Sequence, residues 1–92
     1  MTFLANNYNR KKISFKKGIG SYLVATNGKK YLDFCSGIAV NSLGHANPRL
    51  VKALYKQAKK VWHVSNAFTI PEGEMLAKKL VKKTFADSVI FQ

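Results

Sequence analysis

The sequence predicts an α+β fragment that consists of an N-terminal β-hairpin, two amphipathic helices and a buried strand at the end of the chain. Three observations predict this class. Two β-prone runs flank Asn27-Gly28, apolar side chains recur at helical spacing in two later segments, and the last residues form a continuous apolar run. The 92 residues make one small domain at most. A chain of this length buries only about two-thirds of the surface that its unfolded form exposes.

The hairpin is predicted over residues 21–34. Residues 21–25 and 30–34 are rich in apolar and β-prone side chains, and Asn27-Gly28 lies between them. This dipeptide between two β-prone runs is the strongest short-range hairpin signal, because both positions of a tight turn need a positive φ.

The residues before the hairpin carry weaker signals. Residues 1–12 include several asparagines and show little periodicity, so they are predicted to be a loose N-terminal arm. Residues 13–15 alternate apolar and polar side chains, which predicts a short strand that the run Lys16-Lys17-Gly18-Ile19-Gly20 interrupts.

The first helix is predicted over residues 48–62. Asn47 can cap the free backbone amides, and Pro48 suits the first helical position. Apolar side chains recur at helical spacing, and the basic side chains fall mostly on the other side. The apolar positions are Leu50, Val51, Leu54, Tyr55, Ala58, Val61 and Trp62.

The second helix is predicted over residues 71–84, after a connecting loop over residues 64–69. Pro71 starts it, and Glu72 and Glu74 lie in its first turn, whereas four lysines lie towards its end. The helix dipole favours acidic side chains at the N-terminus and basic ones at the C-terminus, so the charge order supports this assignment.

The last predicted element is a strand within residues 87–92. Val89, Ile90 and Phe91 form a continuous apolar run, which is typical of a buried parallel strand. No other predicted element of this chain can cover both faces of such a strand. The sequence therefore predicts that the chain is truncated.

The chain carries a large excess of positive charge, with 16 Lys and Arg against 4 acidic residues and a net charge of +12. Such an excess is typical of proteins that bind nucleic acid or an anionic surface. However, 14 of the 16 are lysines spread along the chain. Lysines on helix backs usually form a solvated face, and arginine is the better residue for reading bases. A stand-alone basic module that binds nucleic acid non-specifically is therefore the alternative function, and nucleic acid is not the expected partner.

Composition also bears on location. The N-terminus has no apolar region of the kind found in secretory signals, and no window approaches the length of a membrane span. The protein is therefore expected to be cytoplasmic, with no membrane partner. Cys35 is the single cysteine and lies in an apolar run, so it is expected to be a buried, inert thiol.

The residues offer no metal site and no self-contained catalytic site. His45 and His63 are the only imidazoles, and no cysteine or carboxylate lies near them at ligand spacing. His45 follows a glycine and precedes a helix cap, so it is expected to hydrogen-bond backbone and fix the turn. No nucleophile or orienting acid for it is evident. Asp33 lies on a hairpin strand and is expected to pair with a lysine.

Small residues dominate the segment over residues 36–44, which contains Gly37 and Gly44. The segment lacks the closely spaced glycines and the Lys-Ser/Thr ending of a phosphate-binding loop. Close backbone packing beside a pocket is the better prediction, because glycine permits close approach.

The sequence resembles the class III aminotransferases, which depend on pyridoxal phosphate, over nearly its whole length. The likeness is concentrated in Gly-Ile-Ala-Val-Asn-Ser-Leu-Gly-His over residues 37–45, and it extends through residues 13–34, Ser65-Asn66 and residues 89–91. The motif Ser-Gly-Ile-Ala at residues 36–39 resembles the branch of this family that acts on N-acetylornithine more than the branch that acts on ornithine.

The resemblance implies a type I PLP-dependent transferase fold. Residues 13–86 would be the N-terminal segment of such an enzyme, and residues 87–92 would begin its large cofactor-binding domain. The implied activity is transfer of an amino group between N-acetylornithine and 2-oxoglutarate in arginine biosynthesis. The implied partners are the missing C-terminal portion, a second copy in a homodimer and the small-molecule substrate.

The resemblance also implies where the chemistry lies. The Schiff-base lysine, the aspartate that partners the pyridinium nitrogen and the arginine that grips the substrate carboxylate would all follow Gln92. No catalytic or cofactor-binding residue is therefore assigned in this chain. The chain alone is expected to be inactive and not to bind pyridoxal phosphate.

Three residues match family segments that line the substrate entrance, namely Ile38, Asn66 and Phe68. Ile38 stands where ornithine aminotransferases tend to carry a tyrosine, which suits an acylated substrate. Core packing is nearly as good an explanation for these apolar and amide side chains.

Overall fold

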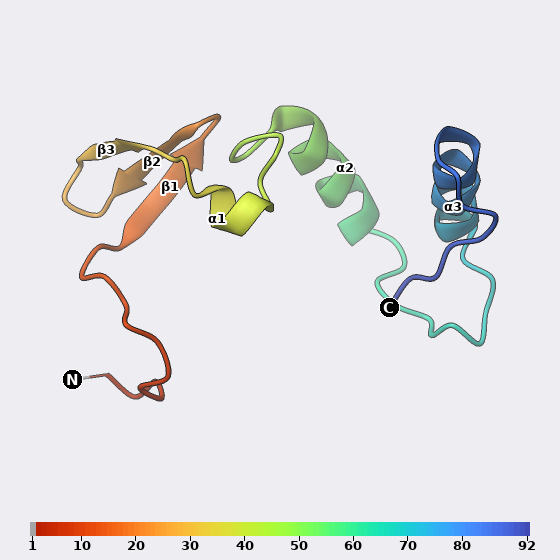
Figure 1. Ribbon diagram of the computed structural model, residues 1–92, viewed down its shortest axis with the longest axis horizontal. Helices are drawn as coiled ribbons and strands as arrows, with labels where there is room; N and C mark the ends of the chain where they lie inside the picture. The colour runs from red at the N-terminus through yellow and green to blue at the C-terminus, as the bar shows by residue number, and fades with distance from the viewer. Residues whose placement is uncertain (1) are drawn as a thin grey trace. The chain divides into compact units, whose positions relative to one another are not determined.

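The computed structural model describes residues 2–92, and the chain divides into two compact units, the first ending at Lys56 and the second comprising Gln57–Gln92. The secondary structure is of the predicted α+β class, with strands and helices in separate parts of the sequence (Figure 1). The elements are β1 (Phe15–Ile19), β2 (Tyr22–Ala25), β3 (Lys30–Leu32), α1 (Ser36–Ala39), α2 (Pro48–Ala58) and α3 (Pro71–Lys83).

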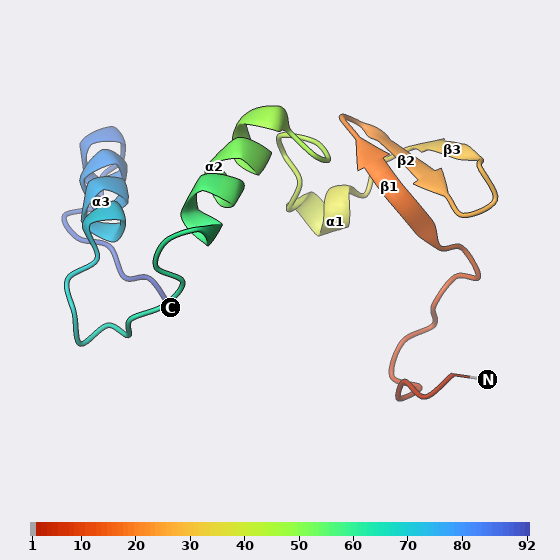
Figure 2. The ribbon, with the colours of Figure 1, turned by 180° about the vertical axis from the view of Figure 1, so that it is seen from behind.

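The first unit contains a three-stranded antiparallel sheet with the order β1-β2-β3, which is visible from both sides (Figure 1, Figure 2). β2 and β3 form the hairpin, with Leu23 opposite Tyr31. The loop does not adopt the predicted geometry, because only Gly28 of the Asn27-Gly28 pair has a positive φ, of 86°. Ala25 accepts a hydrogen bond from the Gly28 amide at 2.9 Å, which is typical of a three-residue loop that ends in a left-handed glycine.

β1 extends further than the sequence predicts. It includes Lys16 and Lys17, which were expected to interrupt it, and pairs with β2 through a register shift between Phe15 and Lys17. Pairing with a neighbouring strand outweighs the weak local β propensity here. Lysines at the edge of a sheet also discourage pairing with other chains.

The buried core of the described residues is small. Val24 and Ala25 of β2 are the only buried apolar residues among them, with 9% and 3% exposure. Phe15 and Tyr31 pack edge to face beside them, with ring centroids 5.8 Å apart. Such an aromatic pair contributes about 0.5–1.5 kcal/mol beyond the area that it buries.

α2 begins as predicted and ends four residues early. The Asn47 side chain accepts a hydrogen bond from the Arg49 amide at 3.0 Å, which caps the helix. The helix was expected to reach residue 62 but ends at Ala58. The Trp62 indole Nε1 donates to the Ala58 carbonyl at 2.7 Å. In a longer helix that carbonyl would accept the Trp62 backbone amide, so the side chain replaces the last helical hydrogen bond.

α3 lies within one residue of its predicted end. Pro71 occupies the first turn together with Glu72 and Glu74, and lysines occupy the last turn. The Thr84 hydroxyl donates to the Leu80 carbonyl at 2.9 Å, which satisfies one of the free carbonyls at the helix end.

The predicted strand within residues 87–92 is not formed. Val89–Phe91 have no secondary structure and pair with no strand of the described chain, and Ile90 is 80% exposed. A strand needs a neighbour for its backbone hydrogen bonds, and this segment has none. None of the helices in residues 2–92 is both long and apolar enough to cross a membrane.

The isolated chain is expected to unfold without a cooperative transition, because two buried apolar residues cannot offset the conformational entropy of a folded chain. Circular dichroism during heating should show a broad, gradual loss of structure, and a hydrophobic dye should bind at low temperature. A sharp thermal transition without dye binding would contradict this expectation.

Candidate functional site

Asp33 and His45 form a part-buried, hydrogen-bonded pair in the first unit. Asp33 directly follows β3, and His45 lies three residues before α2. The His45 Nε2 and Asp33 Oδ2 atoms are 2.7 Å apart. The Asp33 side chain is 8% exposed and the His45 side chain 20% exposed, so the pair is part-buried.

The environment of Asp33 favours its ionised form. The hydrogen bond with His45 is the largest effect that lowers the pKa of this carboxyl group, and the Ser36 and Cys35 amides lower it further. Those amides lie 2.9 Å and 3.1 Å from Oδ1. An ionised carboxylate can only accept hydrogen bonds, so the proton between the two side chains belongs to His45 Nε2.

Backbone hydrogen bonds attach the same residues to the sheet. The His45 amide donates to the Gly20 carbonyl at 2.8 Å, and the Gly20 amide donates to the His45 carbonyl at 3.0 Å. The Asp33 amide donates to the Ser21 carbonyl at 2.8 Å. A Cβ atom on Gly44 would lie 2.8 Å from the Gly20 carbonyl oxygen, so only glycine fits there. The close backbone packing predicted for the small-residue segment is therefore observed.

α1 is a left-handed turn rather than an ordinary helix. Four successive residues have positive φ angles: Ser36 (52°), Gly37 (64°), Ile38 (62°) and Ala39 (61°). The Val40 amide donates to the Ser36 carbonyl at 2.9 Å and closes the turn. A left-handed helical conformation costs a residue with a side chain roughly 1–2 kcal/mol. Three side chains share this conformation here, so surrounding contacts must hold it.

A small polar cavity of about 190 Å³ lies beside the pair. No serine hydroxyl in residues 2–92 hydrogen-bonds to His45, so these residues alone do not form a nucleophilic triad. The arrangement holds backbone in place and presents no reactive group. The lining residues are Gly20, Ser21, Asp33, Ser36, Asn41, Ser42, Gly44 and His45.

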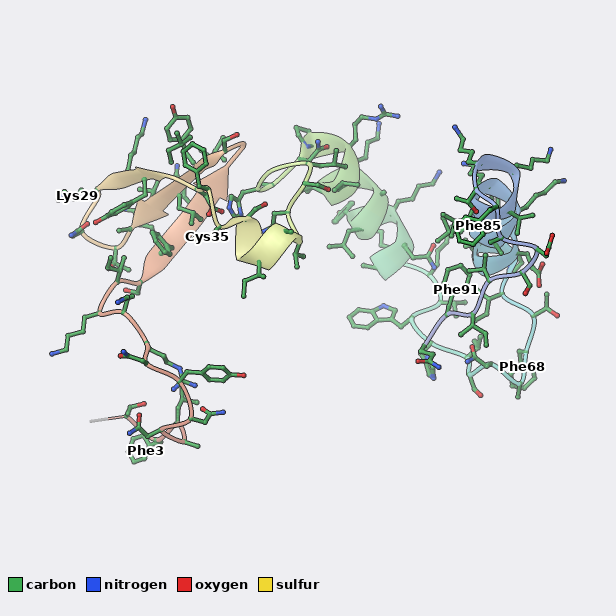
Figure 3. All side chains as sticks on the ribbon, in the orientation of Figure 1. Phe3, Lys29, Cys35, Phe68, Phe85 and Phe91 are labelled. Carbon is green, nitrogen blue, oxygen red and sulfur yellow. The ribbon has the colours of Figure 1, made fainter. Side chains whose placement is uncertain are left out.

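The structure corrects two expectations about this site. Asp33 pairs with His45 and not with a lysine, so His45 does have an acidic partner. Little in the sequence indicates that Asp33 and His45 form a pair, because the two residues lie twelve positions apart and the turn between them is irregular. Cys35, which is labelled in Figure 3, is exposed and not buried. Its backbone amide donates a hydrogen bond to Asp33 Oδ1 at 3.1 Å.

The three predicted substrate-entrance residues fall in different units. Ile38 lies in the middle of the left-handed turn and is 91% exposed. Asn66 and Phe68 belong to the second unit, where they line a cavity of about 630 Å³ together with Phe91. Phe68 and Phe91 are labelled in Figure 3. The Ser65 hydroxyl accepts a hydrogen bond from the backbone two residues later and shapes this loop. The structure thus places Asn66 and Phe68 around one cavity.

Residues 2–92 do not by themselves bring together the groups that pyridoxal phosphate needs. The cofactor needs a lysine for its Schiff base and a carboxylate near its ring nitrogen. Every lysine side chain is exposed, and no lysine lines the cavity beside Asp33. The Asp33 carboxylate is already engaged by His45 and two amides. No group of three or more potential metal ligands occurs in this part of the chain either.

Comparison with known proteins identifies the family. Residues 3–92 match the family model described as aminotransferase class III. The chain belongs to the class III aminotransferases.

The curated relatives of this class III chain include acetylornithine aminotransferases. Acetylornithine aminotransferase 1 from Bradyrhizobium diazoefficiens is 57% identical over 82 residues, which are 89% of this chain and 20% of the relative. The Aquifex aeolicus enzyme is 52% identical over 91 residues, which are 99% of this chain and 24% of the relative.

The fold of the chain also matches solved structures of this kind. N-acetylornithine aminotransferase from Stenotrophomonas maltophilia is 40% identical, with a TM-score of 0.75 over 82% of this chain and 21% of that structure. The chain therefore spans about a fifth of the length of the relatives that it matches.

The Asp33 carboxylate is expected to stabilise the fold at neutral pH and to lose this effect in acid. Its pKa is lowered on folding, so the stabilisation is present above the ordinary aspartate pKa and disappears as the pH falls through the folded-state value. The protein for this test is a chimera in which residues 1–92 replace the matching segment of the Aquifex aeolicus relative. Asp33→Asn should lower the urea midpoint at about pH 7, and the difference should shrink below about pH 4.

Asp87→Asn is the matched control for this measurement, because it removes an exposed carboxylate from the second unit. An Asp33→Asn effect that stays constant from neutral to acidic pH would show that charge is not what Asp33 contributes.

Proposed function

We propose that this chain is the N-terminal part of a pyridoxal-phosphate-dependent aminotransferase that transfers an amino group between N-acetylornithine and 2-oxoglutarate in arginine biosynthesis. The observation that carries the proposal is the class III match over residues 3–92, together with relatives of that name at 50–57% identity. The likeness in fold to a solved N-acetylornithine aminotransferase supports it independently.

The chain's own contribution is to shape the site and not to perform the chemistry. Among the described residues, no lysine lies beside an enclosed carboxylate. We therefore assign no catalytic residue, no cofactor-binding residue and no reaction step to this chain. Pyridoxal phosphate and the reacting groups would be held by the C-terminal portion. We also propose that the enzyme forms a homodimer and that it is located in the cytoplasm.

Ile38, Asn66 and Phe68 are proposed to lie at the substrate entrance. The exposure of Ile38 supports this role, because its side chain is not used for packing within the described residues. The cavity lined by Asn66 and Phe68 has apolar and polar walls, which suits a substrate with an acyl group and an amide.

The exposed apolar surface supports a partial enzyme over the alternative of a self-sufficient basic module. A module that binds nucleic acid on its own should bury its large apolar side chains. Leu54, Trp62 and Ile90 are 72%, 84% and 80% exposed. These side chains are proposed to be covered by the remainder of the aminotransferase.

The chimera is expected to form glutamate from N-acetylornithine and 2-oxoglutarate, whereas the isolated chain should form none, because covalent catalysis requires the lysine. A coupled assay for glutamate measures both. A soluble chimera that binds pyridoxal phosphate but acts on neither N-acetylornithine nor ornithine would refute the proposal.

Replacing Ile38 with tyrosine is expected to move the chimera's preference from N-acetylornithine towards ornithine. A bulkier, polar side chain at the entrance should lower kcat/KM for the acylated substrate by about tenfold. Ile13→Tyr adds the same group to the N-terminal region and should leave the ratio of the two kcat/KM values unchanged. Equal effects of the two substitutions on the ratio of kcat/KM values would show that Ile38 does not lie at the substrate entrance.

A further inference from the structure

The left-handed turn of α1 cannot be explained by the preferences of its own residues. Ser36, Ile38 and Ala39 have side chains and positive φ angles, and only Gly37 adopts such an angle freely. The residues on either side return to negative φ, with −77° at Cys35 and −88° at Val40. Strained backbone of this kind persists only where surrounding contacts over-determine it, and it is concentrated at functional sites.

A single carboxylate connects this turn to the sheet. Asp33 Oδ1 accepts the Ser36 amide at 2.9 Å, at the first left-handed residue. Asp33 Oδ2 is bound by His45 Nε2 at 2.7 Å, and the His45 backbone exchanges two hydrogen bonds with Gly20. The side-chain contacts to the start of the turn therefore run through Asp33, and His45 holds Asp33 from the side of the sheet.

The turn carries an exposed apolar side chain at its centre. Ile38 is 91% exposed, although it occupies a backbone conformation that isoleucine adopts rarely. Neither burial nor local backbone preference favours isoleucine there. A contact outside the turn is the remaining physical reason for an apolar side chain at this position.

We propose that Asp33 and His45 are positioning residues that hold the left-handed turn. They thereby fix Ile38 where it discriminates N-acetylornithine, in which one amino group is acylated, from ornithine, in which that group is free. This inference rests on the function proposed above, and it extends that function to two residues that do not touch the substrate. Loss of either side chain releases the turn and moves Ile38.

The test compares Asp33→Ala with Asp87→Ala in the chimera, with N-acetylornithine and ornithine as substrates. Asp33→Ala should raise KM for N-acetylornithine about tenfold and change kcat and cofactor content less than twofold, because the turn positions a binding contact and no reacting group. His45→Ala should act in the same direction. Asp87→Ala, which removes an exposed carboxylate, should change neither constant.

A second substitution separates positioning from general destabilisation. Ala39→Gly relieves strain at a φ of 61°, so adding it to Asp33→Ala should reverse much of the increase in KM. Ala53→Gly makes the same chemical change within α2 and should recover nothing. Equal effects on both substrates, or no recovery by Ala39→Gly, would overturn the proposal.

Two further measurements cover the case of a poorly folded or inactive variant. If Asp33→Ala does not fold, Asp33→Asn replaces it. An unchanged ratio of the KM values for N-acetylornithine and ornithine in that variant overturns the proposal. A crystal structure of the variant chimera reports on the turn without any activity. Positive φ angles retained at residues 36–39 would overturn the inference even if the parent chimera is inactive, whereas inactivity of the parent chimera alone bears on the proposed function.

Discussion

The local structure of the first unit depends on the Asp33 carboxylate. Its two oxygens bind the start of the left-handed turn and the His45 imidazole, and His45 in turn exchanges backbone hydrogen bonds with Gly20. The bonds to the carboxylate join an ionised acceptor to an amide or imidazole donor, and such charge-assisted hydrogen bonds are stronger than neutral ones. The hairpin, the turn and the start of α2 are therefore connected through one side chain.

A second constraint is the shortage of buried apolar surface. Val24 and Ala25 are the buried apolar residues of the described chain, whereas large side chains such as Leu54 and Trp62 remain exposed. Hydrophobic burial is the dominant favourable term in folding, so a segment with so little of it gains its stability mainly from contacts outside itself. This agrees with a chain that spans about a fifth of its relatives' length.

Local signals predicted the elements whose cause is local. Asn27-Gly28 marks the hairpin, Asn47-Pro48 starts α2, and the charge order of α3 matches its dipole. The errors arose where a distant or unexpected partner decides the outcome. β1 runs through Lys16 and Lys17 because β2 pairs with it, and within residues 2–92 the expected strand near Val89 has no strand to pair with.

The sequence by itself determined the fold class, the family likeness and the close approach of the backbone around Gly44. Only the tertiary structure decided that Asp33 pairs with His45 and that residues 36–39 turn left-handed. The physical reason is that neither feature follows from the preference of any single residue. A left-handed run of side chains is unfavourable locally, so it exists only where a carboxylate, an imidazole and a glycine from separate segments meet and hold it.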